Sequence, residues 1–333
     1  MPIALVLGGG NAVAAYDAGA FEALSEAGHE PDHVAGASAG AVAAALIAGN
    51  PPERRVDVLR HFWALLTQPS LQWPWAPEQW RRPAEIRDGL ATRLLGRPAM
   101  FNLNVSSLFD PSSVPSLYDL DPFRKTLESL VDLSRLNEGP MRVSLLAVDL
   151  ETGEEVVFDN RQMVLGIDHV LASCAMLPDF PPVSINGRLL VDGGLAANTP
   201  VHLVLEPARD SLVCFAVDPF PLSAAPPKRM LDAQERQSDL IYACQTRRSL
   251  ATYSKIWDLE ARIGGKHAAR GAAWHLQYHA AEDETALKGF SFGADILRRR
   301  WDTGRQDMQA ALESWGGQPP SQAGLVIRAM SNK

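Results

Sequence analysis

The most informative segment of the chain is VAGASAG at residues 34–40, in which an apolar run leads into a Gly-x-Ser-x-Gly pattern. An alanine-rich apolar stretch follows, so the pattern predicts that Ser38 lies at a sharp turn between a strand and a buried helix. Such a turn strains the serine backbone, and a side chain at Gly36 or Gly40 would collide with the neighbouring strand or helix. The free N–H groups and the dipole of the helix start also favour the negative charge that develops during acyl transfer.

A second glycine-rich block, LVLGGGN at residues 5–11, ends a short apolar run that is typical of a buried parallel strand. A helix is expected over residues 12–26, and a strand, glycine loop and helix can either bind phosphate or stabilise an oxyanion. A dinucleotide site requires a small residue where Val13 stands, and the Gly-x-x-x-x-Gly-Lys pattern of nucleotide loops is absent. The sequence therefore favours backbone N–H donors at Gly8, Gly9 and Gly10, with nucleotide binding or a purely structural turn as alternatives.

The third block is LLVDGG at residues 189–194. The pair Asn186-Gly187 between two apolar runs predicts a hairpin that delivers Asp192 to the end of a strand. Gly193 and Gly194 leave the carboxylate free of neighbouring side chains. Taken alone, an aspartate in this position can also be a turn residue that binds its own backbone.

Together these three blocks resemble the patatin-like acyl hydrolases, a family of lipid-cleaving enzymes with a Ser-Asp dyad; the resemblance runs from Ile3 to about Asp218. It implies a three-layer α/β/α fold with a mostly parallel central sheet. It also implies that Ser38 is the nucleophile and that Asp192 accepts its proton directly. The expected substrate is a fatty-acyl ester such as a phospholipid or lysophospholipid, with peripheral membrane contact, no cofactor and no metal.

The glycine loop departs from the common family pattern. Many members carry Gly and then Arg or Lys after the glycines, whereas this chain has NAVA at residues 11–14. A cation near the oxyanion is therefore missing, although backbone donors do not depend on residue type. We expect reduced or altered activity, with the Asn11 amide as an additional candidate donor. A lipid-binding or scaffold protein of the same fold is the alternative.

A Ser-His-Asp triad is the obvious rival mechanism. The α/β-hydrolases place their nucleophile after several strands, but only one strand is expected before the one that leads into Ser38. His202, His275 and His279 follow Asp192 in the chain, so residue order alone does not exclude them. Metal binding by His275 and His279 is disfavoured, because the segment is predicted to be a strand, which sets the two residues too far apart for one ion.

Composition narrows the function further. The chain has 333 residues, 46% hydrophobic content and a net charge of −8, which disfavours a general attraction to nucleic acid or to anionic membrane surfaces. Its three cysteines, Cys174, Cys214 and Cys244, have neither disulfide-framework nor zinc spacing, so a reducing compartment fits best. No apolar run approaches the length of a membrane span. These features predict a cytoplasmic protein.

The domain organisation follows from changes in composition. We expect a hydrolase domain at 1–218, a proline-rich boundary at 219–227 and a mainly helical extension at 228–333 that resembles a region of some bacterial patatin-like proteins. Residues 68–120 are rich in Trp, Pro and Ser, and are expected to form a cap or lid insertion that is neither regular helix nor strand. The alternative for its tryptophans is that they bury against each other.

Overall fold

The computed structural model of the chain describes residues 1–68, 81–106, 116–206, 211–264, 268–280, 284–285 and 287–330. Within these ranges, nine strands form one mixed sheet in the order β11-β10-β9-β1-β2-β5-β8-β7, with β6 paired to β5. The strands of this sheet are β1 (Ile3–Leu7), β2 (His33–Ala37), β5 (Arg142–Asp149), β6 (Glu155–Asp159), β7 (Val183–Ile185), β8 (Arg188–Asp192), β9 (Leu212–Asp218), β10 (Arg270–Gln277) and β11 (Gly324–Met330). A separate pair is formed by β3 (Asn102–Leu103) and β4 (Tyr118–Asp119).

The centre of the sheet is parallel, as the apolar N-terminal run predicts. Strand β1 pairs in parallel with β2 on one side and with β9 on the other, and all five of its residues are buried. Alternate side chains of β1 enter two different cores: Ile3, Leu5 and Leu7 enter one, and Ala4 and Val6 enter the other. A strand that is buried on both faces must be apolar throughout, which explains its composition.

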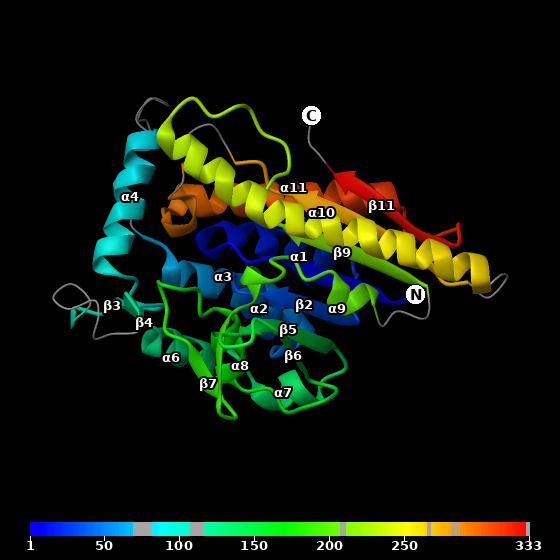
Figure 1. The fold of residues 1–333 in the computed structure, drawn as a ribbon, viewed down its shortest axis with the longest axis horizontal. Helices are drawn as coiled ribbons and strands as arrows, with labels where there is room; N and C mark the ends of the chain where they lie inside the picture. Colours follow the sequence, from blue (N-terminus) through cyan, green and yellow to red (C-terminus); the bar gives the residue numbers. More distant parts are fainter. Residues whose placement is uncertain are drawn as a thin grey trace.

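Helices cover both faces of the sheet and give the molecule three layers (Figure 1). The core on one face includes α1, α2, α3 and α11, whereas the core on the other includes α9 and α10. The helices are α1 (Ala15–Glu26), α2 (Ala39–Ala48), α3 (Arg55–Leu66), α4 (Arg81–Leu95), α6 (Asp121–Leu130), α7 (Leu133–Glu138), α8 (Ile167–Ser173), α9 (His202–Leu205), α10 (Met230–Gly264) and α11 (Ala294–Trp315). The expected three-layer α/β/α fold is confirmed.

The first helix is buried on every side. The predicted stretch is divided into a short 3-10 turn, η1 (Asn11–Ala14), and α1, whose residues are buried from Ala15 to Leu24. Its second face is covered by α11, which passes so close that a Cβ atom at Gly19 would lie 1.9 Å from the carbonyl oxygen of Trp301. The C-terminal region is thus packed directly against the first helix.

The C-terminal region also extends the central sheet. Strand β10 pairs in parallel with β9, and β11 pairs in parallel with β10, so two strands that follow the proline-rich segment continue the sheet of the N-terminal part. Strand β10 corresponds to a strand expected near Trp274, whereas β11 was not expected. Its side chains are only partly buried, so it lacks the apolar run that marks the central strands.

The insertion contains a helix that the sequence interpretation missed. Residues 68–120 were expected to lack regular structure, but residues 81–95 form α4, so this part of the prediction was wrong. The helix has Pro83 in its first turn and ends before Gly96, as helix-boundary preferences require. The polar side chains of Glu85, Asp88 and Thr92 form its buried face, which disguised its amphipathic pattern. The three tryptophans of the insertion lie outside the described residues.

Candidate active site

The register of the sheet brings two distant parts of the chain together. Ala37 at the end of β2 is paired with Leu146 of β5, and the next residue of β5, Ala147, is paired with Asp192 at the end of β8. Ser38, which follows β2, and Asp192, which ends β8, therefore lie on opposite sides of β5 at neighbouring register positions. Since β1 is parallel to β2, the glycine loop that follows β1 lies at the same edge.

Ser38 occupies the strained turn that the sequence predicts. Its backbone has φ 54° and ψ −127°, a conformation that residues with a side chain rarely adopt, and α2 begins at the next residue. A Cβ atom at Gly36 would lie 2.4 Å from the Gly40 carbonyl, and one at Gly40 would lie 2.0 Å from the Leu7 carbonyl oxygen. The close approach of β1, β2 and α2 thus requires both glycines, as expected.

Asp192 is fully buried beside the serine. Burial raises the pKa of its carboxyl to about 7, and interactions with the Ser38 side chain and the N–H of Gly194 oppose this change. The Gly194 N–H donates to Oδ1 at 2.7 Å. Oδ2 is buried and has no hydrogen-bond partner among the described residues. The effect of the Ser38 side chain on the pKa of Asp192 shows that the hydroxyl and the carboxyl are neighbours.

Gly193 and Gly194 are both constrained by close neighbours. A Cβ atom at Gly193 would lie 2.2 Å from the Leu146 carbonyl oxygen, and one at Gly194 would lie 2.9 Å from the Asn198 side chain. A larger residue at Gly193 would push the turn away from β5, and one at Gly194 would crowd the side chains of Asn198 and Asp192. These glycines therefore fix the position of Asp192 relative to Ser38.

The glycine loop offers fewer free donors than the sequence suggests. The Gly8 N–H donates to Val217 and the Gly9 N–H donates to Asn198, both to backbone oxygens. Among the described residues, the backbone N–H groups of Gly10 and Asn11 have no such partner. The candidate oxyanion donors are thus narrowed to Gly10 and Asn11, which line the same cavity as Ser38. Asn11 has φ 51°, a left-handed conformation that asparagine tolerates better than most residues.

Asn198 connects the glycine loop with the Asp192 turn, and sequence reasoning missed it. Its Nδ2 donates to the Gly9 carbonyl at 2.9 Å, while its own backbone oxygen accepts from the Gly9 N–H. Helix α9 begins only at His202, because Pro200 and these loop contacts hold the residues before it in a turn. The only sequence signal was a polar residue six positions after Asp192.

Ser38, Asp192 and the glycine loop open into a cavity of about 240 Å³. One end is lined by apolar side chains from α2, α3 and α6, including Leu46, Phe62 and Phe123. This wall provides an environment for a hydrocarbon chain. Cys174 also lines the cavity, but burial raises the pKa of its thiol well above the ordinary value, so it is not a competing thiolate nucleophile.

The three histidines considered for a triad lie elsewhere. His202 Nε2 is 3.1 Å from a Glu155 carboxylate oxygen, and His275 Nε2 is 3.2 Å from the Asp218 carboxylate. The Nδ1 of His279 is 2.9 Å from the backbone oxygen of Gln277. None of the three lines the cavity that contains Ser38.

The cavity beside Ser38 and Asp192 is thus lined mainly by apolar side chains. A model of the patatin-like phospholipase family matches residues 5–205, more than half of the chain. The chain belongs to the patatin-like phospholipase family, and the resemblance seen in its three glycine-rich blocks is thereby confirmed.

Several solved structures are similar to the chain at low sequence identity. VipD from Legionella pneumophila has a TM-score of 0.45 and 16% identity, over 94% of this chain and 67% of that one. The type III effector protein ExoU has a TM-score of 0.40 and 16% identity, over 96% and 54% of the two chains. ExoU in complex with SpcU, from Pseudomonas aeruginosa, has a TM-score of 0.31 and 18% identity, over 74% and 50%. The chain thus spans about half the length of the ExoU chains.

Proposed function

We propose that the protein is a serine acyl-ester hydrolase that cleaves fatty-acyl esters of phospholipids or lysophospholipids through an acyl-Ser38 intermediate. The observation that carries this proposal is the approach of the strained Ser38 to a buried carboxyl with a pKa of about 7, inside a cavity with an apolar end. Family membership supports the same class of substrate.

In this mechanism Asp192 takes the hydroxyl proton of Ser38 as the oxygen attacks the ester carbonyl. An ordinary aspartate is too weak a base for an alcohol, but the raised pKa of Asp192 brings its basicity close to neutral pH. The N–H groups of Gly10 and Asn11 stabilise the oxyanion, and the dipole of α2 adds to this effect. The proton passes from Asp192 to the leaving alcohol, and water then cleaves the acyl-serine by the same steps.

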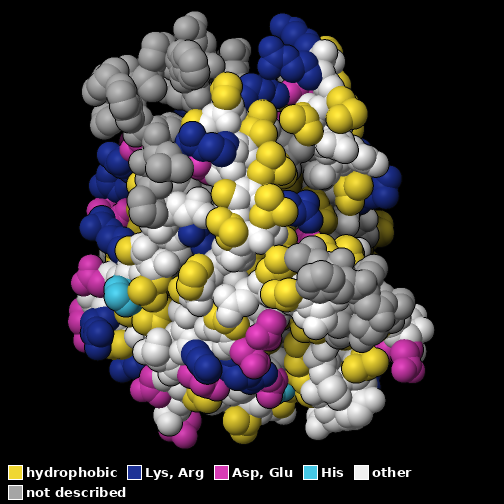
Figure 2. Space-filling view, turned by 90° about the vertical axis from the view of Figure 1, so that its left-hand side faces the viewer, with side chains coloured by type: hydrophobic (Ala, Val, Ile, Leu, Met, Phe, Trp, Pro, Cys, Tyr) yellow, Lys and Arg dark blue, Asp and Glu magenta, His cyan; other side chains and the backbone are white. Residues whose placement is uncertain are grey.

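We further propose that α4 makes the peripheral membrane contact. Leu90, Leu94 and Leu95 are exposed on this helix, at 48%, 66% and 79%. The exposed Arg87 and the half-buried Arg93 lie among them and pair with Asp88 and Asp179. Figure 2 shows hydrophobic and cationic side chains interspersed on this face of the molecule. Arg93 packs over the ring of Phe290, which lines the cavity, so the helix lies beside the active site. Although the whole chain has a net charge of −8, a local apolar surface with cations is suited to an anionic lipid interface. Within the described ranges, no helix has the length and apolar character that crossing a bilayer requires.

The domain division is retained as a proposal: a hydrolase domain over residues 1–218 and a C-terminal extension from residue 228. The two are joined through one sheet, so the extension contributes to the stability of the domain. A catalytically weakened lipid-binding protein is the second candidate, because the Gly8 and Gly9 N–H groups are occupied by other partners.

The test compares the wild type with Ser38→Ala and Asp192→Asn on a short-chain chromogenic ester and on a lysophospholipid. We expect loss of at least a hundredfold in kcat for each variant, since each removes a reacting group. Labelling by a fluorophosphonate probe should occur in the wild type and disappear in Ser38→Ala. Full turnover in either variant contradicts the dyad. Absence of labelling together with intact lipid binding supports the second candidate.

A further inference from the structure

The cavity has a second end that differs from the apolar one. We use this name for the part of the lining contributed after residue 218: Phe220 from the proline-rich segment, and Glu235, Ser238, Tyr242 and Lys288 from the C-terminal region. All five residues lie beyond residue 205, where the family match ends. An ester bound at Ser38 has an acyl part and an alcohol part, and the apolar end suits the acyl part. The C-terminal region therefore faces the alcohol part of the substrate.

The C-terminal region also touches the glycine loop. A short 3-10 turn, η6 (Lys288–Phe290), packs against η1. A Cβ atom at Gly289 would lie 3.8 Å from the Gly10 carbonyl oxygen and 4.0 Å from the Cβ of Asn11. The turn thus places Lys288 close to the loop in which the cation common in the family is missing.

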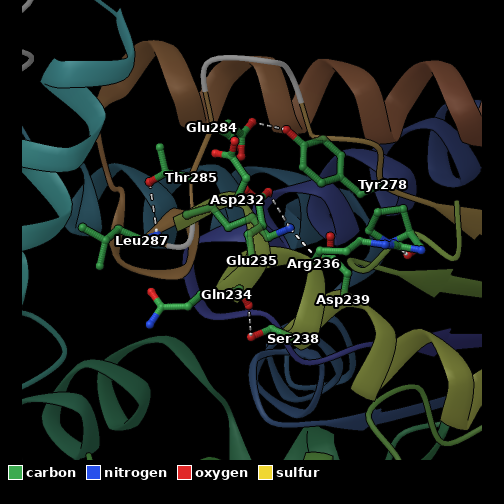
Figure 3. Close-up of polar contacts among 12 residues, drawn as sticks. Asp232, Gln234, Glu235, Arg236, Ser238, Asp239, Tyr278, Glu284, Thr285 and Leu287 are labelled. Atoms are coloured by element: carbon green, nitrogen blue, oxygen red, sulfur yellow. Dashed lines mark hydrogen bonds and ion pairs between the residues drawn. The ribbon is translucent and has the colours of Figure 1, made fainter. Parts of the chain in front are cut away.

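Lys288 is held by two carboxylates from α10. Its Nζ is 2.7 Å from an Asp239 oxygen and 3.2 Å from a Glu235 oxygen. Figure 3 shows that Glu235 and Asp239 project from α10 on the side of the segment that contains Thr285 and Leu287. The Asp239 side chain is 5% exposed and does not line the cavity, whereas that of Glu235 is 15% exposed and does. Glu235 is therefore the partner of Lys288 that a ligand can replace.

The charges at this end restrict what can bind. Among the described residues, Lys288 is the one cationic side chain that lines the cavity. An anion that approached Lys288 would separate it from Glu235 and leave that carboxylate without a counterion in a partly buried site, at considerable cost. A group that carries both charges avoids this cost, because its cation can pair with the displaced carboxylate. The Phe220 ring already interacts with a cation, because Lys288 Nζ lies 5.6 Å from its centroid. The adjoining Tyr242 ring, with its centroid 4.7 Å from that of Phe220, adds favourable surface for an alkylammonium group.

We propose that this end of the cavity is a head-group site that selects zwitterionic phospholipids, with the phosphate at Lys288 and the ammonium group at Glu235 beside the two rings. This proposal rests on the proposed function. Asp239 still holds Lys288 in place when Glu235 changes partner. The C-terminal region therefore sets the specificity of the hydrolase for the alcohol part of its substrate.

The test measures kcat/KM for three substrates with the same acyl chain: lysophosphatidylcholine, lysophosphatidylglycerol and monoacylglycerol. The wild type should prefer lysophosphatidylcholine. Glu235→Gln should lower the ratio of kcat/KM for lysophosphatidylcholine to kcat/KM for lysophosphatidylglycerol about tenfold, because it removes the partner of the ammonium group. Lys288→Met should lower kcat/KM for both lysophospholipids relative to kcat/KM for monoacylglycerol. The control Glu26→Gln, at an exposed ion pair with Arg305 on the surface, should leave all ratios unchanged.

A measurement on the wild type does not depend on whether the variants fold. Free phosphocholine should inhibit hydrolysis of a short chromogenic ester more strongly than glycerol phosphate, by about tenfold in inhibition constant. Equal inhibition, or a substrate ratio that Glu235→Gln leaves unchanged, overturns the head-group site. A wild type that cleaves no ester and does not react with a fluorophosphonate instead overturns the proposed function itself.

Discussion

Replacing Asp192 by asparagine should stabilise the protein above neutral pH while it removes activity. Burial raises the pKa of this carboxyl from 3.8 to about 7. Below pH 3.8 the group is protonated in both the folded and the unfolded chain, so it adds no pH dependence there. Between pH 3.8 and 7 only the folded chain holds the proton, and the wild type loses about 1.4 kcal/mol of stability for each pH unit. The accumulated loss is on the order of 4 kcal/mol at pH 8.

The assay is urea unfolding of the wild type and of Asp192→Asn at several pH values between 4 and 8.5. The difference between their free energies of unfolding should move in favour of the variant by on the order of 4 kcal/mol across this range. Any constant effect of the amide on packing cancels, because only the change with pH is compared. Asp295→Asn, at an exposed ion pair with Arg298, is the matched control and should give a difference that stays within about 0.5 kcal/mol. A flat difference for Asp192→Asn would show that the carboxyl is ionised or solvated in the folded protein, and would refute its role as a base near pH 7.

Three further predictions follow from the same structure. Since Asp192 must be ionised to accept the proton, kcat/KM should rise about tenfold per pH unit below pH 7 and level off above it, as a pH–rate profile will show; a flat profile contradicts this. In a urea titration, Gly304→Ala should lower the free energy of unfolding by about 2 kcal/mol or more, because its Cβ would lie 2.0 Å from the Tyr16 carbonyl oxygen. The control Gly293→Ala, whose Cβ would lie 3.6 Å from its nearest neighbour, should lower the free energy of unfolding much less. Leu94→Glu should weaken binding to anionic vesicles in a flotation assay several-fold while hydrolysis of a soluble ester stays unchanged, and equal vesicle binding contradicts membrane contact by α4.

Much of the fold could be predicted because its central strands are buried on both faces and must therefore be apolar throughout. The run before Gly8 is apolar at every position, which a strand between two helical layers requires. The hairpin at Asn186-Gly187 was equally clear and was confirmed as β7 and β8. Helix α4 was missed because its buried side carries the charged residues Glu85 and Asp88, and the Ser291 hydroxyl that donates to Glu85 comes from a distant part of the chain.

The candidate site was predicted less completely, for a similar reason. The strained turn at Ser38 requires small neighbours, so it leaves a signature in adjacent residues. The free donors of the glycine loop leave no such signature, because every residue except proline has the same backbone N–H group. The carbonyl oxygens of Val217 and Asn198 determine which of these N–H groups are already bonded. Lys288 is far from every motif and carried no signal at all.

By itself the sequence determined the buried parallel strands, the serine turn and the family, because each depends on residues that are close together in the chain. Only the tertiary structure decided that Asp192 faces Ser38 across β5 and that its burial raises the pKa to about 7. It also decided that the C-terminal region closes one end of the cavity. Burial and charge pairing depend on what surrounds a side chain in space, and here those surroundings come from segments that the sequence keeps far apart.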